Sequence, residues 1–417
     1  MTTKPCSTNP IPSALLVFAG ATFLIGSAGA ETARLGSSSS GLGAEFAYST
    51  AMDGPRVAIG SPGEAAQAGA VYTYVCTAGR CLEPTRLVAG DLAAGDLFGS
   101  TVALSGDTLA VSAPGQQPAA VYLYTRSGST WSQQARIGAP DGVLSAGFAN
   151  TLALQGDRLV VGANDAIAGI GAVYVYSRSG SQWTAQARLA ANDGLAGDRF
   201  GSSVALSGDS VLVGAPNRPG AGAGSHAQGA AYVFVQTLGT WSQQARLNPN
   251  ASTNGDRFAA AVALDGDRAL IGAPLSNGGI GRAYVFERAS AVWTAQAQLD
   301  ANNGAAGDRF AWSVALDGDT ALVGAPFARA TCGASYRFRR NGAVWGPLGN
   351  SSVAVPALGN LSGWSVAIDG GRFLVGAPGF NGAAEHRGAG YWFDPIEQIF
   401  VDGLDDNTAI ECVLPPA

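Results

Sequence analysis

Residues 200–216 read FGSSVALSGDSVLVGAP, two apolar runs on either side of the turn residues Ser-Gly-Asp. The Phe that opens this stretch recurs at Phe46, Phe98, Phe148, Phe258 and Phe310, and Ser362 takes the seventh position. The intervals between successive positions are 52, 50, 52, 58, 52 and 52 residues. A period near 50 with several short strands per unit is typical of a propeller with four-stranded blades. The sequence therefore predicts an all-β, seven-bladed β-propeller.

Each unit contains four apolar segments that are expected to form strands; in the third unit they span residues 148–154, 158–162, 172–177 and 183–189. The marker Phe is expected to open the first hairpin. A Gly followed by Asp separates the first two segments, which indicates a tight turn with positive φ. A Gly/Ser turn separates the last two. Four successive antiparallel strands form a meander, which is one blade.

The last unit indicates how the ring closes. It reaches its third strand at Tyr391-Trp392-Phe393 and has no W-x-x-Q-A-R-L segment after it. The missing segment is present at residues 32–35, where Arg34 precedes Phe46 by 12 residues, as Arg188 precedes Phe200. Residues 32–35 are therefore predicted to pair with residues 391–393 and to complete the last blade, which removes an exposed sheet edge.

The first 30 residues read as a signal peptide, with an apolar core at residues 14–25 and a small-x-small site at Ala28-Gly29-Ala30. A single membrane anchor is the alternative, against which the polar sequence from Glu31 weighs. The domain boundaries follow as residues 1–30 for the signal, 31–394 for the propeller and 395–417 for a tail. We expect a monomer that is secreted or held at the cell surface or in the periplasm, without a membrane span after cleavage. A net charge of −6 argues against a nucleic-acid partner.

A polar residue stands five positions before each Trp of the outer strands, across the hairpin, and Arg over Trp there predicts a cation–π contact. The pairs are Arg126/Trp131, Arg178/Trp183, Gln236/Trp241, Arg288/Trp293 and Arg340/Trp345. In the first unit the same two positions hold Cys76 and Cys81, which predicts a hairpin disulfide. Cys332 and Cys412 are then left to pair with each other.

Three stretches carry a family resemblance: FGSTVALSGDTLAVSAP at residues 98–114, FGSSVALSGDSVLVGAP, and FAWSVALDGDTALVGAP at residues 310–326. They resemble the FG-GAP repeats of integrin α-subunit propellers, over essentially all of residues 31–394. The resemblance implies a seven-bladed propeller that acts in extracellular binding or adhesion.

Units of that family often hold Ca²⁺ in a D-x-D-x-D-G-like loop. Here the loop has contracted to turns in which Asp265/Asp267 and Asp317/Asp319 are the most acidic. We interpret these residues as turn formers, because two carboxylates in a tight turn cannot enclose Ca²⁺ alone. The acidic residues before the marker Phe, among them Asp91, Asp96, Asp198, Asp256 and Asp308, are interpreted in the same way, with a weak cation site as the alternative. No metal or other cofactor is therefore expected.

Signatures of catalysis such as H-E-x-x-H, G-x-S-x-G and the Walker loop are absent from the sequence, so a non-enzymatic binding module is expected. The loops between second and third strands share one face with the loops between blades, and propellers usually bind there. The candidate ligand-binding residues on these loops are Glu64, Asn217, Arg218, His226, Glu385, His386 and Arg387. The expected partner is an extracellular protein or glycan.

Two alternatives remain open. The chain would be a carbohydrate-active enzyme, a lyase or hydrolase on a propeller scaffold, if Glu64, Glu385 and His386 formed a reactive cluster. It would be a structural envelope component if it had no discrete ligand.

Overall fold

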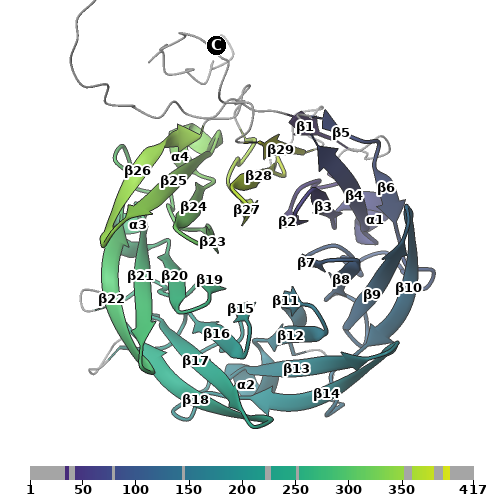
Figure 1. Ribbon diagram of the computed structural model, residues 1–417, viewed down its shortest axis with the longest axis horizontal. Coiled ribbons are helices and arrows are strands. Elements are labelled where there is room, and N and C mark those ends of the chain that lie inside the picture. Colours follow the sequence, from purple (N-terminus) through teal and green to yellow (C-terminus); the bar gives the residue numbers. More distant parts are fainter. Residues whose placement is uncertain are drawn as a thin grey trace, which may run out of the picture.

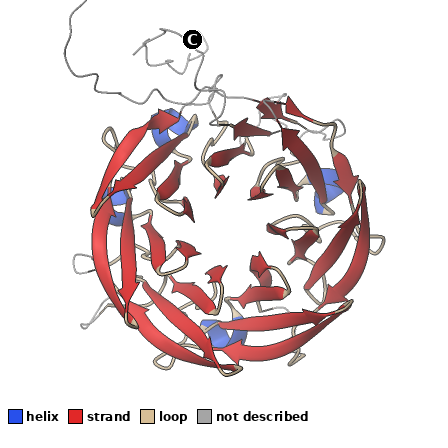
Figure 2. Ribbon diagram, in the orientation of Figure 1, coloured by secondary structure: helices blue, strands red, loops and turns tan. Residues whose placement is uncertain are grey.

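The computed structural model describes residues 33–36, 43–77, 80–142, 146–220, 227–249, 253–351, 359–379 and 388–394. Seven antiparallel sheets surround a central axis (Figure 1). The strands cover most of the ring in Figure 2, and the few helical turns lie between them. The predicted all-β, seven-bladed propeller is confirmed.

The strands of each blade run outward from the axis in chain order. They are β2 (Ser49–Asp53), β3 (Arg56–Ser61), β4 (Ala70–Thr77), β5 (Arg80–Cys81) and β6 (Thr85–Leu87) in blade 1; β7 (Val102–Ser105), β8 (Thr108–Ala113), β9 (Ala120–Ser127) and β10 (Thr130–Ile137) in blade 2; β11 (Phe148–Gln155), β12 (Arg158–Ala163), β13 (Ala172–Ser179) and β14 (Gln182–Leu189) in blade 3; β15 (Ser203–Ser207), β16 (Ser210–Ala215), β17 (Ala230–Thr237) and β18 (Thr240–Leu247) in blade 4; β19 (Ala261–Asp265), β20 (Arg268–Ala273), β21 (Arg282–Ala289) and β22 (Val292–Leu299) in blade 5; β23 (Ser313–Asp317), β24 (Thr320–Ala325), β25 (Ala334–Asn341) and β26 (Val344–Ser351) in blade 6; and β27 (Ser365–Asp369), β28 (Arg372–Ala377) and β29 (Ala389–Phe393) in blade 7.

Four helices of four residues each lie in loops between second and third strands: α1 (Glu64–Gln67), α2 (Ala166–Gly169), α3 (Ser276–Gly279) and α4 (Ala328–Thr331). The two central residues of each helix have left-handed backbone angles, such as φ of 54° at Ile167 and 56° at Ala168. These helices are therefore tight turns of the loops. No helix in the described parts of the chain has the length and apolar character that crossing a bilayer requires.

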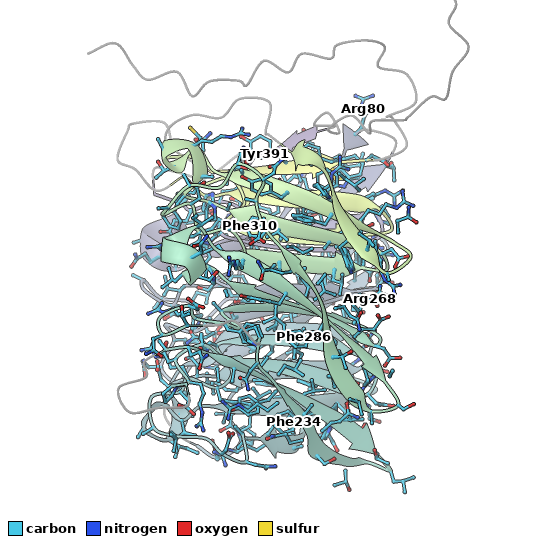
Figure 3. The ribbon with its side chains drawn as sticks, turned by 90° about the vertical axis from the view of Figure 1, so that its left-hand side faces the viewer. Arg80, Phe234, Arg268, Phe286, Phe310 and Tyr391 are labelled. Atoms are coloured by element: carbon cyan, nitrogen blue, oxygen red, sulfur yellow. A yellow bond between two sulfur atoms is a disulfide. The ribbon has the colours of Figure 1, made fainter. Side chains whose placement is uncertain are left out.

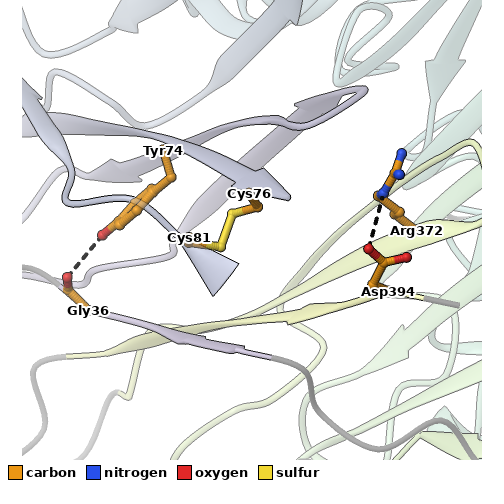
Figure 4. The surroundings of a disulfide bond; sticks show 6 residues. All are labelled: Gly36, Tyr74, Cys76, Cys81, Arg372 and Asp394. Carbon is orange, nitrogen blue, oxygen red and sulfur yellow. Dashed lines mark hydrogen bonds and ion pairs between the residues drawn. A yellow bond between two sulfur atoms is a disulfide. The ribbon is translucent and has the colours of Figure 1, made fainter. Parts of the chain in front are cut away.

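The N-terminal strand β1 (Ala33–Leu35) completes blade 7, as predicted. The sheet order is β1-β29-β28-β27, and Arg34 pairs with Tyr391 just as Arg188 pairs with Tyr174 in blade 3. Next to β1, the Tyr74 hydroxyl of blade 1 donates a hydrogen bond to the Gly36 carbonyl over 2.9 Å (Figure 4). The N-terminal segment is thus bonded to blade 7 through β1 and to blade 1 through Gly36, so it links the two blades at which the ring closes.

The marker Phe does more than open a hairpin, which corrects the sequence-based expectation. Except in blade 3, the inner strand begins three or more residues after the marker. The backbone of Phe200 instead forms a parallel bridge to Gly171 of the preceding blade, and its ring packs edge-on against Tyr232 at 5.6 Å. Equivalent bridges occur at Phe46, Phe98, Phe258, Phe310 and Ser362. The Phe is buried because it joins two neighbouring blades.

The hairpin turns and the first disulfide agree with the sequence analysis. All seven turns between first and second strands contain a Gly with positive φ, for example 53° at Gly208. Cys76 and Cys81 are directly opposite in the β4–β5 hairpin and form a disulfide (Figure 4). Cys332 is also disulfide-bonded. Its predicted partner, Cys412, lies outside the described residues, so that pairing stays a prediction.

Candidate functional site

The two faces of the ring differ in their connections. The short-turn face carries the turns between strands 1 and 2 and between strands 3 and 4 of each blade. The loop face carries the connections between strands 2 and 3 and those between successive blades. Figure 3 shows the ring edge-on, with Arg268 of the short-turn face at its right-hand side.

A belt of hydrogen bonds links the blades along the short-turn face. In blades 1 to 6 the amide of the turn Gly donates to the side chain that precedes the turn of the previous blade, as in Gly318 N to Asp265 Oδ2 at 2.7 Å and Gly208 N to Gln155 Oε1 at 2.7 Å. The Asp of the turn binds Arg, as in Arg288 to Asp267 at 2.6 Å. These contacts support the interpretation of the turn carboxylates as structural residues. Within the described ranges, no three His, Cys, Asp or Glu side chains are grouped closely enough to hold a metal ion.

The predicted Arg–Trp contacts are correct in two blades. Arg178 lies over Trp183 at 5.3 Å and Arg288 over Trp293 at 5.2 Å from the ring centroid. The prediction is wrong for Trp345, which is covered by Arg268 of the preceding blade at 5.9 Å.

Trp241, whose facing residue is Gln236, is likewise covered from the preceding blade, by Arg158 at 5.3 Å. The facing residue Arg340 turns away from Trp345 toward Glu287 at 3.4 Å and Asp319 at 3.6 Å. Arg268 pairs with the same two carboxylates, at 3.5 Å and 3.3 Å, so Glu287 and Asp319 bridge both guanidinium groups.

The acidic residues before the marker Phe stabilise turns on the loop face. Asp198 Oδ2 accepts a hydrogen bond from the Leu195 amide at 2.8 Å, and Asp308 Oδ2 accepts one from the Ala305 amide at 2.8 Å. Asp96 and Asp256 make the same contact with the amides of Ala93 and Thr253. The interpretation of these residues as turn formers is supported at all four positions.

Glu64 is a buried residue of blade 1, with 6% of its surface exposed. Its carboxylate accepts a hydrogen bond from the Tyr72 hydroxyl at 2.7 Å and forms an ion pair with Arg86 at 2.6 Å. In blade 4 the equivalent Tyr232 and Arg246 contact Asp193 of the preceding inter-blade loop. Glu64 therefore supplies, from α1, the acidic group that other blades receive from that loop.

Asn217 and Arg218 lie in the long loop of blade 4. Arg218 is buried; it pairs with Asp198 at 2.6 Å and with Asp193 at 3.2 Å. The Asn217 amide donates to the Asp198 carbonyl at 3.3 Å. Both residues thus hold their own loop in place, and the ring separates them from Glu64 in blade 1 (Figure 1).

His226, Glu385, His386 and Arg387 lie outside the described residues. Ligand contact by any of the seven candidate residues stays a prediction.

An aromatic cluster on the loop face was missed by the sequence reasoning. It consists of Tyr48, Trp312, Phe327 and Trp364, all half-buried. Trp364 lies between Trp312 and Tyr48, with ring centroids 5.0 Å and 5.5 Å away, and Phe327 packs edge-on against Trp312 at 5.5 Å. Three of these residues precede the inner strands β23, β27 and β2, which are neighbours around the axis in Figure 1. The cluster thus spans blades 6, 7 and 1.

The repeat contains a signal for this cluster. Two residues after the marker, the other four blades carry Ser100, Asn150, Ser202 and Ala260, whereas the adjacent blades 6, 7 and 1 carry Trp312, Trp364 and Tyr48. Aligning the units at this single position would have identified the cluster.

Two charged residues flank the aromatic cluster. The guanidinium of Arg309 lies 4.4 Å from the Phe327 ring centroid and 5.6 Å from that of Trp312. At the opposite end lies Glu45, whose carbonyl accepts a hydrogen bond from the Tyr48 amide at 3.1 Å. Burial raises the pKa of the Glu45 carboxyl. Burial and the nearby Glu45 charge together raise the pKa of the Tyr48 hydroxyl. The cluster therefore combines ring faces with one basic and one acidic group.

A pocket of about 590 Å³, here called the blade-6 pocket, adjoins the cluster. Phe327 belongs to both. Polar lining residues of the pocket include Asn303, Asp308, Arg329 and Thr331. Asn303 Oδ1 accepts a hydrogen bond from the Tyr336 hydroxyl at 2.9 Å, which orients its amide. The loop face of blade 6 thus offers a concave polar surface next to half-buried aromatic rings.

Comparison with known proteins gives a family and a fold. The model of a family described as "FG-GAP repeat" matches residues 82–124, 131–176, 183–234, 241–286 and 293–338, together more than half of the chain. Each match runs from the outer strand of one blade to the third strand of the next. No curated protein matches the chain. The crystal structure of Saccharomyces cerevisiae Sqt1 is similar, with a TM-score of 0.50 and 11% identity over 88% of this chain and 99% of that chain. Similarity at that identity concerns the fold alone.

Proposed function

The chain belongs to the FG-GAP repeat family, and we propose that it is an exported, non-catalytic binding propeller. In this proposal the loop face holds an extracellular protein or glycan. The observation that carries it is the aromatic cluster: half-buried Trp312 and Trp364 occupy positions that four other blades fill with small residues. A local break in a repeat, placed on an irregular loop surface, is typical of a binding site.

Two further features support the proposal. The Cys76–Cys81 disulfide is what an oxidising compartment favours. The carboxylate of Glu64 is engaged by Tyr72 and Arg86, so it serves the packing of blade 1. These two contacts account for the burial of Glu64 through the packing of blade 1.

Arrays of glycans and extracellular proteins, probed with the propeller, test the proposal. We expect a ligand whose binding is weakened by substituting Arg309 on the loop face. Asp267→Ala on the short-turn face is the matched control, because its exposed carboxylate binds Arg288 far from the aromatic cluster. A ligand that is lost with Asp267→Ala but kept with the Arg309 variant would contradict the face assignment.

A screen for polysaccharide cleavage separates this proposal from the enzyme alternative. We expect no turnover by the wild-type chain. Turnover that Glu64→Gln abolishes without lowering the melting temperature would overturn the proposal in favour of a carbohydrate-active enzyme.

A further inference from the structure

The aromatic cluster is not needed to build the inner end of a blade. At the same position, Ser100 and Ser202 stabilise the turn before the inner strand: their hydroxyl groups donate hydrogen bonds to the carbonyls of Leu97 and Arg199, at 2.8 and 2.7 Å. Blades 6, 7 and 1 instead keep large rings that are only half-buried. Large apolar groups that gather at a surface without completing a core indicate a contact surface for a ligand.

The chemistry of the surface indicates what that ligand is. Aromatic ring faces carry negative charge density and attract polarised C–H groups and cations. Around the rings, the guanidinium groups of Arg309 and Arg329 are balanced by the carboxyl groups of Asp308 and Glu45. The described residues around the rings thus carry no net charge, and such a surface does not favour a polyanion such as nucleic acid, whose binding depends on basic side chains. It suits an uncharged molecule with an apolar face and a polar edge.

A pyranose ring has this form, with C–H groups on its faces and hydroxyl groups around its edge. We propose that the aromatic cluster and the blade-6 pocket together form a binding site for a neutral oligosaccharide. One sugar ring stacks on Trp312 and Trp364, and the next extends past Phe327 into the pocket, where Asn303, Asp308 and Thr331 bind hydroxyl groups. The pocket volume of about 590 Å³ lies in the range of small-ligand sites, about 300–1,000 Å³.

This inference rests on the proposed function, since it names the ligand class of the same loop face. The test is titration of the propeller with short neutral oligosaccharides (gluco-, manno-, xylo- and chito-oligomers), with uronate oligomers as a separate arm. Trp312→Ser and Trp364→Ser are the test variants, because Ser is native at this position in blades 2 and 4. We expect each variant to weaken binding of a neutral oligomer by roughly three- to tenfold, the range for loss of one stacking contact. The double variant should weaken it further.

Ser202→Ala is the matched control, at the equivalent position in blade 4, and it should bind like the wild type. Melting temperatures of all variants show whether they fold.

Three results would overturn the inference. The first is absence of binding to every neutral oligomer, and the second is a neutral oligomer that the folded double variant still binds fully. The third is binding confined to uronate oligomers. If the arrays then yield a protein ligand that Arg309→Ala weakens, the inference fails while the proposed function stands.

Discussion

At the scale of single residues, the Gly of the GAP segment decides how closely two blades approach. A Cβ atom on Gly324 would lie 2.0 Å from the carbonyl oxygen of Gly363 in the next blade and 2.3 Å from Ser313 Oγ. The same contact recurs at Gly60, Gly162, Gly214, Gly272 and Gly376. Backbone from two blades meets at these positions, so no side chain fits between them.

Gly324→Ala should therefore lower the free energy of unfolding by about 3 kcal/mol, because the added methyl group overpacks a contact between backbone atoms. Gly346→Ala is the matched control: nothing lies within 4 Å of its Cβ position. We expect the control to change stability by less than about 0.5 kcal/mol. Chemical denaturation of both variants measures the difference. Equal midpoints would show that the blades separate easily at this contact.

At the scale of elements, strand β1 is the piece on which closure depends. Leu35 is 3% exposed and belongs to the core that contains Phe46, Tyr72 and Trp392. Without β1, the third strand β29 would present an unpaired edge, which is a template for association with other chains.

Replacing Ala33-Arg34-Leu35 by Gly-Ser-Gly should cost at least about 2 kcal/mol, the value of burying one Leu side chain. The variant should also aggregate on heating, because the edge of β29 is uncovered. Thermal melting and size-exclusion chromatography test both effects. Arg34→Ser alone is the control, since it keeps Leu35 and the backbone ladder. A triple variant that melts with the wild type would mean that β1 does not hold the ring shut.

The β4–β5 hairpin carries the second prediction at this scale. The Cys76–Cys81 disulfide closes a loop with a sequence separation of 5 residues. For so short a loop, the chain-entropy estimate is about 2 kcal/mol. The double variant Cys76→Ser/Cys81→Ser should lose about that much stability in chemical denaturation. Substitution is preferable to a reducing agent, because Cys332 is disulfide-bonded as well. A loss several times larger would indicate that the bond also holds packing outside the hairpin.

At the scale of the whole molecule, two kinds of blade alternate around the ring. The second strand begins with Arg56, Arg158, Arg268 and Arg372 in the odd blades and with Thr108, Ser210 and Thr320 in the even blades. Each of the first three arginines reaches the turn Asp of the next blade, at Asp107, Asp209 and Asp319.

A ring of seven must bring two odd blades together, and blades 7 and 1 meet in this way. There Pro55 replaces the turn Asp, and Arg372 pairs with Asp394 of its own blade at 3.6 Å (Figure 4). At the junction between blades 7 and 1, the arginine therefore forms its ion pair within its own blade and not with the next blade.

We expect the buried tyrosines on the third strands to make the folded state sensitive to alkali. Burial, together with the Asp141 carboxylate that accepts the Tyr174 hydroxyl, raises the pKa of Tyr174 to about 12. Burial likewise raises the pKa of Tyr336 to about 12 and raises those of Tyr122, Tyr232 and Tyr284. The folded chain therefore holds these protons more tightly than the unfolded chain, whose tyrosines ionise near pH 10.

The stabilisation from these raised pKa values is complete below about pH 10 and is lost as the pH rises toward about 12. Each such tyrosine can contribute a slope of up to about 1.4 kcal/mol per pH unit in that interval. We expect the stability of the folded chain to fall steeply with pH in that interval. Tyrosinate absorbance and melting temperature, measured on the same samples, test this. Tyr336→Phe should show a shallower slope than the wild type. Tyrosinate absorbance that rises near pH 10 in the folded chain would refute the prediction.

The repeat alone determined the architecture, the closure by β1 and the Cys76–Cys81 disulfide. Each of these depends on register within one blade or on counting units, and the 50-residue period aligns equivalent positions directly. Contacts between blades could not be predicted in the same way. They join side chains about one period or more apart, and their geometry exists only once the ring has closed.

The tertiary structure alone therefore decided that Arg268 covers Trp345, that the marker Phe joins two blades and that Glu64 is buried against Arg86. It also decided that Tyr48, at one end of the propeller sequence, meets Trp364 at the other, 5.5 Å away. The physical reason is that units 1 and 7 become neighbours only when the ring closes: the alignment of the repeats marks the aromatic residues, but their contact exists only in the closed ring.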